Sequence, residues 1–366
     1  ATAIYGSRAA NGVILIQTKQ GAAGGVLIEY DGYVASSSPA RSLDLMTGDE
    51  YRTFVQQQID AGEERLRDRL ASLGPENTDW ERELTRNALT HNHNLAFSGG
   101  AENTRYRASL NYMDQEGVVI DNGFERIQAR LNASHQALQN RLRLGLNLNA
   151  TRMNNDYLPY ENTGGFEGGV FTNMVIFDPT RPVFVTDPAS GQEVYYERGP
   201  GRQELRNPVA MAQQVNDRGN TTRTLGNVTA ALDLLPGLTA QLNVGADLSD
   251  GIRRTYLPRN SPVGAQFEGR ARQVSRENSS FTWQSFLTFQ RQLAAQEFDL
   301  VGGFEFADYT STEFGAEGQG FSTDAFGFHN LGGGNTLVRP FSWREDSRLV
   351  SFFSRANYSY GGRYYL

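Results

Sequence analysis

Apolar and polar residues alternate with a period of two over several long stretches of this chain. The clearest stretch is 141–151, RLRLGLNLNAT, where Leu144, Leu146 and Leu148 share one parity and Arg143 and Asn147 share the other. Successive side chains of a β-strand point to opposite faces, so this pattern predicts a strand with one apolar and one polar face. The same pattern recurs at 126–134 and 238–248.

These and similar stretches give ten predicted strands, most of them longer than the five or six residues usual in soluble proteins. A tilted strand needs about 9–11 residues to cross a bilayer, which matches the predicted lengths. The ten strands are 26–36, 91–99, 104–115, 126–134, 141–151, 221–234, 238–248, 279–291, 297–311 and 348–360.

Short and long connections follow one another along the predicted strands. The short ones carry turn residues, such as Leu235-Pro236-Gly237. The long ones are expected at about 37–90, 154–220, 254–278 and 312–347, and the first should contain a helix with Thr47 as its N-cap. Tight turns on one side and large loops on the other are typical of an outer-membrane barrel. The predicted fold is therefore an all-β, transmembrane antiparallel barrel.

Composition excludes several other classes of protein. The net charge of −7 gives no electrostatic support to nucleic-acid binding, and the absence of cysteine excludes disulfides and thiolate zinc sites. No phosphate-binding loop, nucleophile elbow or HExxH motif occurs, so we expect no catalytic residue, no metal and no cofactor. Because residue 1 is alanine, we expect the chain to be an internal or processed piece of a longer protein.

The segment 5–21, YGSRAANGVILIQTKQG, resembles the end of the plug domain in the SusC/RagA family of TonB-dependent outer-membrane transporters. The strands that follow resemble the first half of the family's barrel. The matching plug-end residues are Tyr5, Gly6, Arg8, Ala9, Ala10, Asn11, Gly12, Val13, Ile14, Thr18, Lys19 and Gly21. Their expected role is structural, with 13–16 forming the last strand of the plug.

The resemblance implies a domain division: 1–21 as the carboxyl-terminal end of the plug, and 22–366 as the first part of a barrel that has 22 strands when complete. It also implies TonB-dependent import of a large nutrient, a glycan or a peptide, across the outer membrane of a Gram-negative bacterium. The implied partners are a SusD-like surface lipoprotein and the TonB complex, which would contact a segment outside this chain.

Two sets of residues are candidates for function. Polar positions of the alternating strands are expected to face the lumen, where they could contact the plug or the cargo: Arg126, Arg130, Arg141, Arg143, Asn147 and Asn149. Aromatic residues of the long second loop are expected to contact substrate or the lipoprotein, since rings stack on sugars and pack on peptides: Tyr157, Tyr160, Phe166, Phe171, Tyr195 and Tyr196. Alternatively, these rings only pack the loop itself.

Two other functions stay open at the level of sequence. A passive outer-membrane barrel or adhesin would share the alternation but would lack a plug, so the plug-end segment argues against it. A secreted carbohydrate-binding β-protein would turn its apolar strand faces inward, into a closed core.

Overall fold

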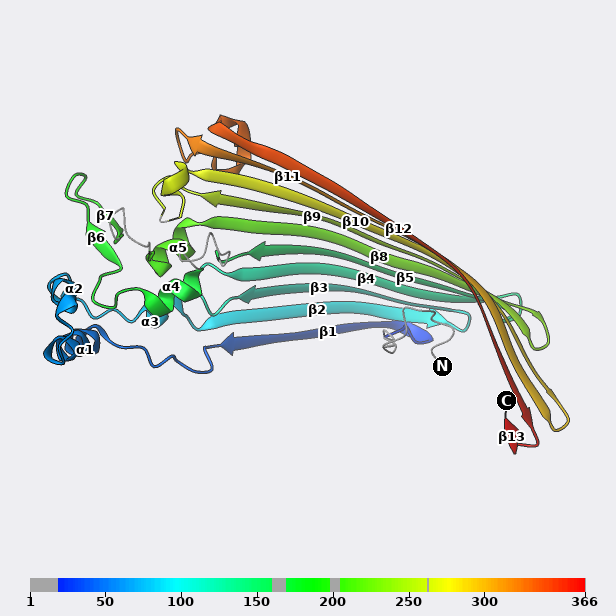
Figure 1. The fold of residues 1–366 in the computed structure, drawn as a ribbon. Coiled ribbons are helices and arrows are strands. Elements are labelled where there is room, and N and C mark those ends of the chain that lie inside the picture. Colours follow the sequence, from blue (N-terminus) through cyan, green and yellow to red (C-terminus); the bar gives the residue numbers. More distant parts are fainter. Residues whose placement is uncertain (1–18, 160–168, 198–204, 262, 366) are drawn as a thin grey trace.

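The computed structural model describes residues 19–159, 169–197, 205–261 and 263–365. Eleven strands form one antiparallel sheet in the order β1-β2-β3-β4-β5-β8-β9-β10-β11-β12-β13, and a separate hairpin pairs β6 with β7 (Figure 1). The strands are β1 Gly24–Ser37, β2 Ala88–Ala101, β3 Thr104–Glu116, β4 Gly123–Ala137, β5 Leu142–Asp156, β6 Phe184–Thr186, β7 Glu193–Tyr195, β8 Asn216–Leu235, β9 Leu238–Leu257, β10 Arg270–Leu293, β11 Gln296–Phe321, β12 Gly334–Tyr360 and β13 Tyr364–Tyr365. The ten predicted strands are thus confirmed. The plug strand expected at 13–16 lies outside the described residues.

The two faces of the sheet differ as the alternation predicts. Register pairs Leu131 with Leu148 and Leu146 with Val228, so apolar side chains of neighbouring strands share one face, here called the apolar face. Leu144, Leu146 and Leu148 are 39%, 37% and 40% exposed there, and they pack into no closed core. The opposite, polar face carries Arg143, Asn147 and their cross-strand neighbours. Gln128 and Glu305 are buried on it, because side chains of adjacent strands crowd around them.

Short turns close one end of the sheet, as predicted. Pro236 and Gly237 join β8 to β9, and Gly237 has a φ of +86°. Gly361 and Gly362 follow β12 with φ of +58° and +66°. Positive φ at both central residues gives a turn whose twist matches that of the flanking strands. The long connections all lie at the other end of the sheet (Figure 1).

Two of the predicted long loops are shorter than expected. Most of 254–278 and 312–347 belongs to strands, and the connections are only 258–269 and 322–333. On the apolar face the side chains change abruptly from apolar to charged, from Leu248 to Asp250 on β9 and from Phe306 to Asp308 on β11. Beyond this boundary polar and apolar residues are mixed on both faces, for example Phe341 and Trp343 beside Arg344 on β12, so the alternation that revealed the strands disappears. Cross-strand ion pairs such as Asp308–Arg348 hold the extensions together.

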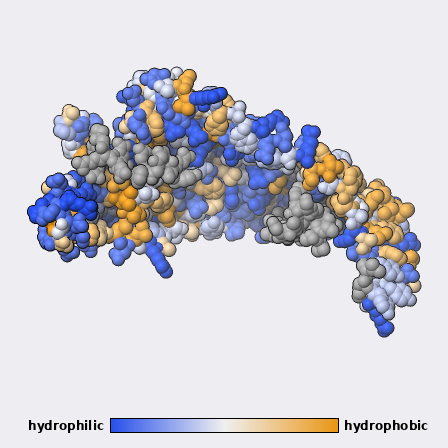
Figure 2. All heavy atoms as spheres, viewed as in Figure 1, coloured by the Kyte–Doolittle hydropathy of each residue, from blue (hydrophilic) through white to orange (hydrophobic). Residues whose placement is uncertain are grey.

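Figure 2 shows the same division on the surface. Hydrophobic residues gather over the turn end of the later strands, whereas the middle of the visible face is largely hydrophilic. On β9 the apolar positions run from Leu238 to Leu248, a length of strand that suits one crossing of a bilayer.

A folded cap covers the long-connection end of the sheet. We call the described parts of 38–87, 157–215 and 258–269 the loop cap. Its helices are α1 Gly48–Asp60, α2 Arg67–Ala71, α3 Trp80–Leu84, α4 Val170–Ile176 and α5 Pro208–Gln214, with 3-10 turns η3 Glu64–Leu66 and η4 Ala265–Phe267; η5 Gly327–His329 and η6 Leu331–Gly333 lie between β11 and β12. Among the described residues, no helix has both the length and the apolar character needed to span a membrane.

The cap has its own hydrophobic core. Buried residues from all three connections meet in it, chiefly Trp80, Leu84, Val170, Met174 and Met211. The predicted helix is confirmed as α1: the hydroxyl of Thr47 accepts from the backbone N–H of Glu50, and the Glu50 carboxylate accepts from the backbone N–H of Thr47. Sequence alternation could not predict this unit because a core assembled from three distant loops leaves no periodic signal.

Candidate functional site

A ladder of amides crosses the middle of the polar face. Asn147 Nδ2 donates to Asn227 Oδ1 at 3.1 Å, and Asn227 Nδ2 donates to Asn243 Oδ1 at 3.3 Å. Asn243 Nδ2 donates to Gln284 Oε1 at 3.0 Å, and Gln284 Nε2 donates to the buried Glu305 carboxylate at 2.8 Å. One row of side chains thus links five neighbouring strands, β5 to β11. Each amide keeps further donor and acceptor capacity, which suits hydrogen bonding to a polypeptide or a sugar.

Arginine–carboxylate pairs flank this ladder toward both ends of the strands. Arg253 makes two hydrogen bonds to Asp217, at 2.8 and 2.6 Å, and Arg143 makes two to Asp233, at 2.6 and 2.9 Å. Such bidentate pairs fix both side chains and satisfy the charge of the arginine within the wall itself.

The predicted polar-face residues divide into three environments. Asn147 belongs to the amide ladder, and the Asn149 side-chain oxygen accepts from Thr151 Oγ1 at 3.4 Å. Arg141 and Arg143 serve the turn end, where Arg141 donates to the backbone oxygens of Asp233 and Leu234. Arg126 and Arg130 lie on β4 apart from these groups. All six share the polar face or its turn-side rim, and the structure does not bring them together into one site.

Two plug-end residues lie within the described part of the chain. The backbone oxygen of Lys19 accepts from Asn132 Nδ2 at 3.1 Å, and Asn132 is on the polar face of β4. Gly21 is buried against the backbone of Tyr106, where an added Cβ would lie 2.1 Å from the Tyr106 oxygen. Only glycine fits this approach. The other plug-end positions, Tyr5 to Thr18, lie outside the described residues.

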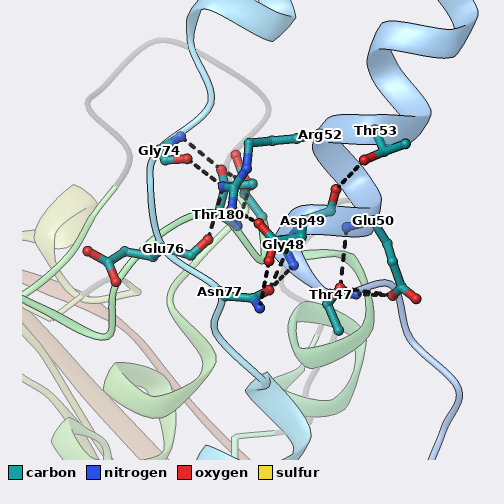
Figure 3. A network of polar contacts seen from close by, with 11 residues as sticks. Thr47, Gly48, Asp49, Glu50, Arg52, Thr53, Gly74, Glu76, Asn77 and Thr180 are labelled. Atoms are coloured by element: carbon teal, nitrogen blue, oxygen red, sulfur yellow. Dashed lines mark hydrogen bonds and ion pairs between the residues drawn. The ribbon is translucent and has the colours of Figure 1, made fainter.

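Hydrogen bonds hold the first loop of the cap in shape, and the one between Gly74 and Thr180 joins it to the second loop (Figure 3). Asn77 Oδ1 accepts from the backbone N–H groups of Gly48 and Asp49 at 2.5 and 3.3 Å. Arg52 donates to the backbone oxygens of Gly74 and Glu76, and Gly74 N–H donates to the buried Thr180 hydroxyl at 3.0 Å. These bonds satisfy the backbone of segments that have no strand or helix partner, so the cap is a rigid platform rather than a set of separate loops.

A cleft of about 430 Å³ opens between the two loops of the cap. Apolar residues line it at 43–46, apart from Asp44, and at 174–177, and Leu43, Met46, Val175 and Ile176 are each about half exposed. Arg69 and Asp178 form an ion pair at 3.1 Å in its lining, with Asp178 buried. A partly apolar cleft with one anchored ion pair is a shape and chemistry that bind peptides or similar ligands.

The predicted aromatic contacts have different environments. Tyr157 lies under the Arg253 guanidinium, 4.6 Å from ring centroid to Cζ. Tyr195 stacks near Phe184 and donates to Gln213, and Tyr196 packs against Phe177. These three rings hold the loop together. Among the four predicted rings that the structure describes, Phe171 is the exposed one, at 52%. Tyr160 and Phe166 lie outside the described residues.

The pKa shifts of cap residues come mainly from burial and from hydrogen bonds to nearby residues. Burial, with a smaller contribution from Asp121, raises the pKa of the Tyr195 hydroxyl. Hydrogen bonds from the Thr47 backbone and hydroxyl lower the pKa of Glu50, and those from Ser190 and Ala189 lower the pKa of Asp187. The described residues include no group of three or more histidine and acidic side chains placed to hold a metal ion.

Sequence reasoning missed two parts of this arrangement. Asn227, Gln284 and Glu305 complete the amide ladder, but strand parity gives only the face of a residue, and the register between strands decides which neighbours bond. Leu43, Met46, Val175 and Ile176 line the cap cleft, and their only sequence signal is apolar character within the long loops.

No family model matches the sequence. The TonB-dependent receptor SusC of Bacteroides thetaiotaomicron is 31% identical, with the alignment covering 100% of this chain and 36% of that protein. The TonB-dependent receptor P3 of Formosa agariphila is 30% identical, covering 100% of this chain and 35% of that protein. The solved RagAB peptide transporter matches with a TM-score of 0.79 at 26% identity, covering 100% of this chain and 44% of that chain. The chain belongs to the SusC/RagA family of TonB-dependent receptors.

This SusC-type chain spans about a third of the length of the curated relatives that it matches. Its eleven-stranded sheet has two open edges, at β1 and β13, and does not close into a barrel within the described residues. The resemblance drawn from the plug-end segment and the alternating strands is confirmed at the level of the family.

Proposed function

We propose that this chain is part of a transporter that imports a large nutrient, a peptide or a glycan, across the outer membrane with energy from the TonB complex. The observation that carries the proposal is the two-faced sheet: one exposed apolar face, one hydrogen-bonded polar face, and a folded cap at one end only. We assign the apolar face to lipid, the polar face to a water-filled lumen and the cap to the cell exterior. No catalytic residue is part of this proposal.

A plug fits the lumen side of this assignment. The contact of Lys19 with Asn132 brings the chain ahead of β1 onto the polar face, and this supports a plugged transporter over a passive barrel. Residues 1–21 are accordingly proposed as the end of the plug, and 22–366 as the first part of the barrel.

A SusD-like surface lipoprotein is the proposed partner at the cap. The cap cleft and the exposed Phe171 supply a rigid, partly apolar surface there, while Tyr157, Tyr195 and Tyr196 act indirectly by holding it in shape. Tyr160 and Phe166 remain proposed contacts. A peptide cargo has the support of one solved relative, which is named a peptide transporter.

The test is uptake by cells that carry the full-length protein. We expect fluorescent oligopeptides or oligosaccharides to enter the periplasm when TonB is functional and to stay outside when TonB is deleted. Gentle detergent purification should also recover a surface lipoprotein with the transporter. Uptake that is equal with and without TonB would contradict the proposal and favour a passive barrel.

A further inference from the structure

Most arginines of the polar face are neutralised by the wall itself. Seven of them form an ion pair with a carboxylate on another strand, and in six of the seven that strand is the next one in the sheet. The exception is Arg107–Glu29, which spans β2. The six others are Arg143–Asp233, Arg223–Asp247, Arg253–Asp217, Arg270–Glu317, Arg276–Glu313 and Arg355–Asp299. Arg126 and Arg130 form no ion pair with any residue that the structure describes, as is also true of Arg105 on β3 and Arg272 on β10. Arg126 and Arg130 are two such arginines on one strand.

These two arginines line one small pocket. They lie four residues apart on β4, so both side chains are on the polar face. The pocket has a volume of about 160 Å³, and its other lining residues are Asn94, Ser109, Asn111 and Gln128. Every lining residue is neutral or basic. Two positive charges therefore meet hydrogen-bonding groups but no negative charge.

The hydrogen bonding of Arg126 is also incomplete. Its Nη2 donates to Asn111 Oδ1 at 3.1 Å, while its Nε is buried and has no partner among the described residues. An arginine cannot shed its proton to avoid this cost, and a partly buried guanidinium needs an anion or acceptors. The planar fork of donors matches a carboxylate in particular.

We propose that Arg126 and Arg130 form a carboxylate-binding site on the lumen wall, and that the carboxylate belongs to the plug domain. Asn111 orients Arg126 from the side, because its oxygen accepts from Arg126 while its nitrogen donates to Asn92 and to the backbone oxygen of His93. This inference rests on the proposed function, because it requires a plug within the barrel. Asn132, the next polar-face residue of β4 after Arg130, already bonds Lys19, and two residues of strand span about 7 Å. The path of the chain thus brings plug polypeptide close to the pocket.

The sequence limits where this carboxylate can come from. The first acidic residue is Glu29, and Glu29 is paired with Arg107. Residues 1–28 therefore cannot supply the anion. Relatives are nearly three times as long as this chain, so a plug segment further ahead in the full protein has room to provide an aspartate or glutamate. A pocket of this size admits a carboxylate and its nearest carbons, but not a whole peptide.

The experiment uses the full-length transporter in detergent and compares Arg126→Gln/Arg130→Gln with two controls. Arg126→Lys/Arg130→Lys keeps the charge but loses the planar fork, and Arg143→Gln removes an arginine whose carboxylate partner is on the wall. Hydrogen exchange of the plug backbone is the readout. We expect the Gln pair to speed exchange in one plug segment by about tenfold or more, the Lys pair to speed it less, and Arg143→Gln to leave that segment unchanged.

The other possible outcomes distinguish a carboxylate of the plug from a carboxylate of the cargo. If plug exchange is unchanged but the variant loses affinity for a free peptide relative to its C-terminally amidated form, the carboxylate comes from cargo and the plug assignment is overturned. If neither measurement changes, the carboxylate site itself is refuted. Loss of TonB-dependent uptake is measured separately, so failure of this inference does not depend on failure of the transport proposal.

Discussion

At the scale of the residue, adjacent positions of β5 have opposite environments. Leu146 points to the apolar face between Ala133 and Val228, and Asn147 points to the amide ladder. The difference follows from the alternation of side chains along a strand. In the proposed orientation, one residue therefore faces lipid and the next faces the water-filled lumen.

We expect Leu146→Arg to destabilise the full-length barrel by about 2–4 kcal/mol, because an arginine near the middle of the bilayer is poorly solvated. Asn147→Arg is the matched control and should cost far less, since its side chain enters the polar face. Denaturant unfolding in lipid vesicles measures both. Equal losses at the two positions would contradict the assignment of faces.

The capping box of α1 gives a pH-dependent prediction in the loop cap. The pKa of Glu50 is lowered from its usual value of 4.5 by hydrogen bonds from Thr47. A lowered pKa in the folded state means that this stabilisation is complete above the usual value and is lost as pH falls through the folded value. Protection of the α1 amides from hydrogen exchange should therefore be full above the usual value of 4.5 and should fall as the pH drops further below it.

The control for that prediction is Glu50→Gln, which should remove the pH dependence contributed by this carboxylate. Thr47→Ala should lower the stability of the helix by about 1 kcal/mol at neutral pH, and Thr47→Ser should restore most of it. Protection that falls equally in the wild type and in Glu50→Gln would show that another group is responsible.

At the scale of the element, the hairpin turns depend on a few glycines. Gly237 has a φ of +86°, and a Cβ added there would lie 2.3 Å from the backbone oxygen of Gln290. Gly237→Ala should destabilise the β8–β9 hairpin by at least about 1–2 kcal/mol, since both the backbone conformation and the space oppose it. Gly25→Ala, with no atom within 4 Å of the added carbon, is the control. Unfolding midpoints of both variants in detergent measure the difference. A Gly25→Ala midpoint lowered as much as that of Gly237→Ala would contradict this prediction.

Strand alternation predicted the elements of the sheet wherever one face is apolar. It failed at 270–278 and 334–347, because beyond Asp250 and Asp308 polar and apolar residues are mixed on both faces and the period of two is lost. It also failed for α3, α4 and α5, whose buried residues come from separate loops. For the candidate site, parity placed Arg126 and Arg130 on the right face, but only the register of β3, β4 and β5 shows that they share a pocket without a carboxylate.

The core of the cap should unfold independently of the strands. Trp80 is 3% exposed, contacts Phe177 edge to face at 5.0 Å, and donates to the backbone oxygen of Asp178. Trp80→Ala should cost the cap about 3–5 kcal/mol and open its loops to protease, while the strands stay intact. Phe171→Ala, at an exposed position, should leave proteolysis unchanged. Cleavage within the strands of Trp80→Ala would show that cap and sheet unfold together.

At the scale of the whole molecule, the side chains of the strands change character along the strand length. On β9 the residues from Leu238 to Leu248 alternate between apolar and polar faces, and those from Asp250 to Leu257 continue the strand with polar side chains on both faces for most of its length. In the proposed orientation, the membrane boundary crosses the middle of β9, with the cap on one side of it and the short turns on the other.

A nitroxide scan along β9 tests this most directly. Single cysteines at 238–257 in the full-length protein, with any other cysteines removed, would be spin-labelled in lipid vesicles and probed with oxygen and with a water-soluble nickel chelate. The account predicts that even positions from 238 to 248 are accessible to oxygen, that odd positions are accessible to the chelate, and that the oxygen preference ends near Asp250. Even positions shielded from both probes would indicate a closed hydrophobic core and would contradict the account.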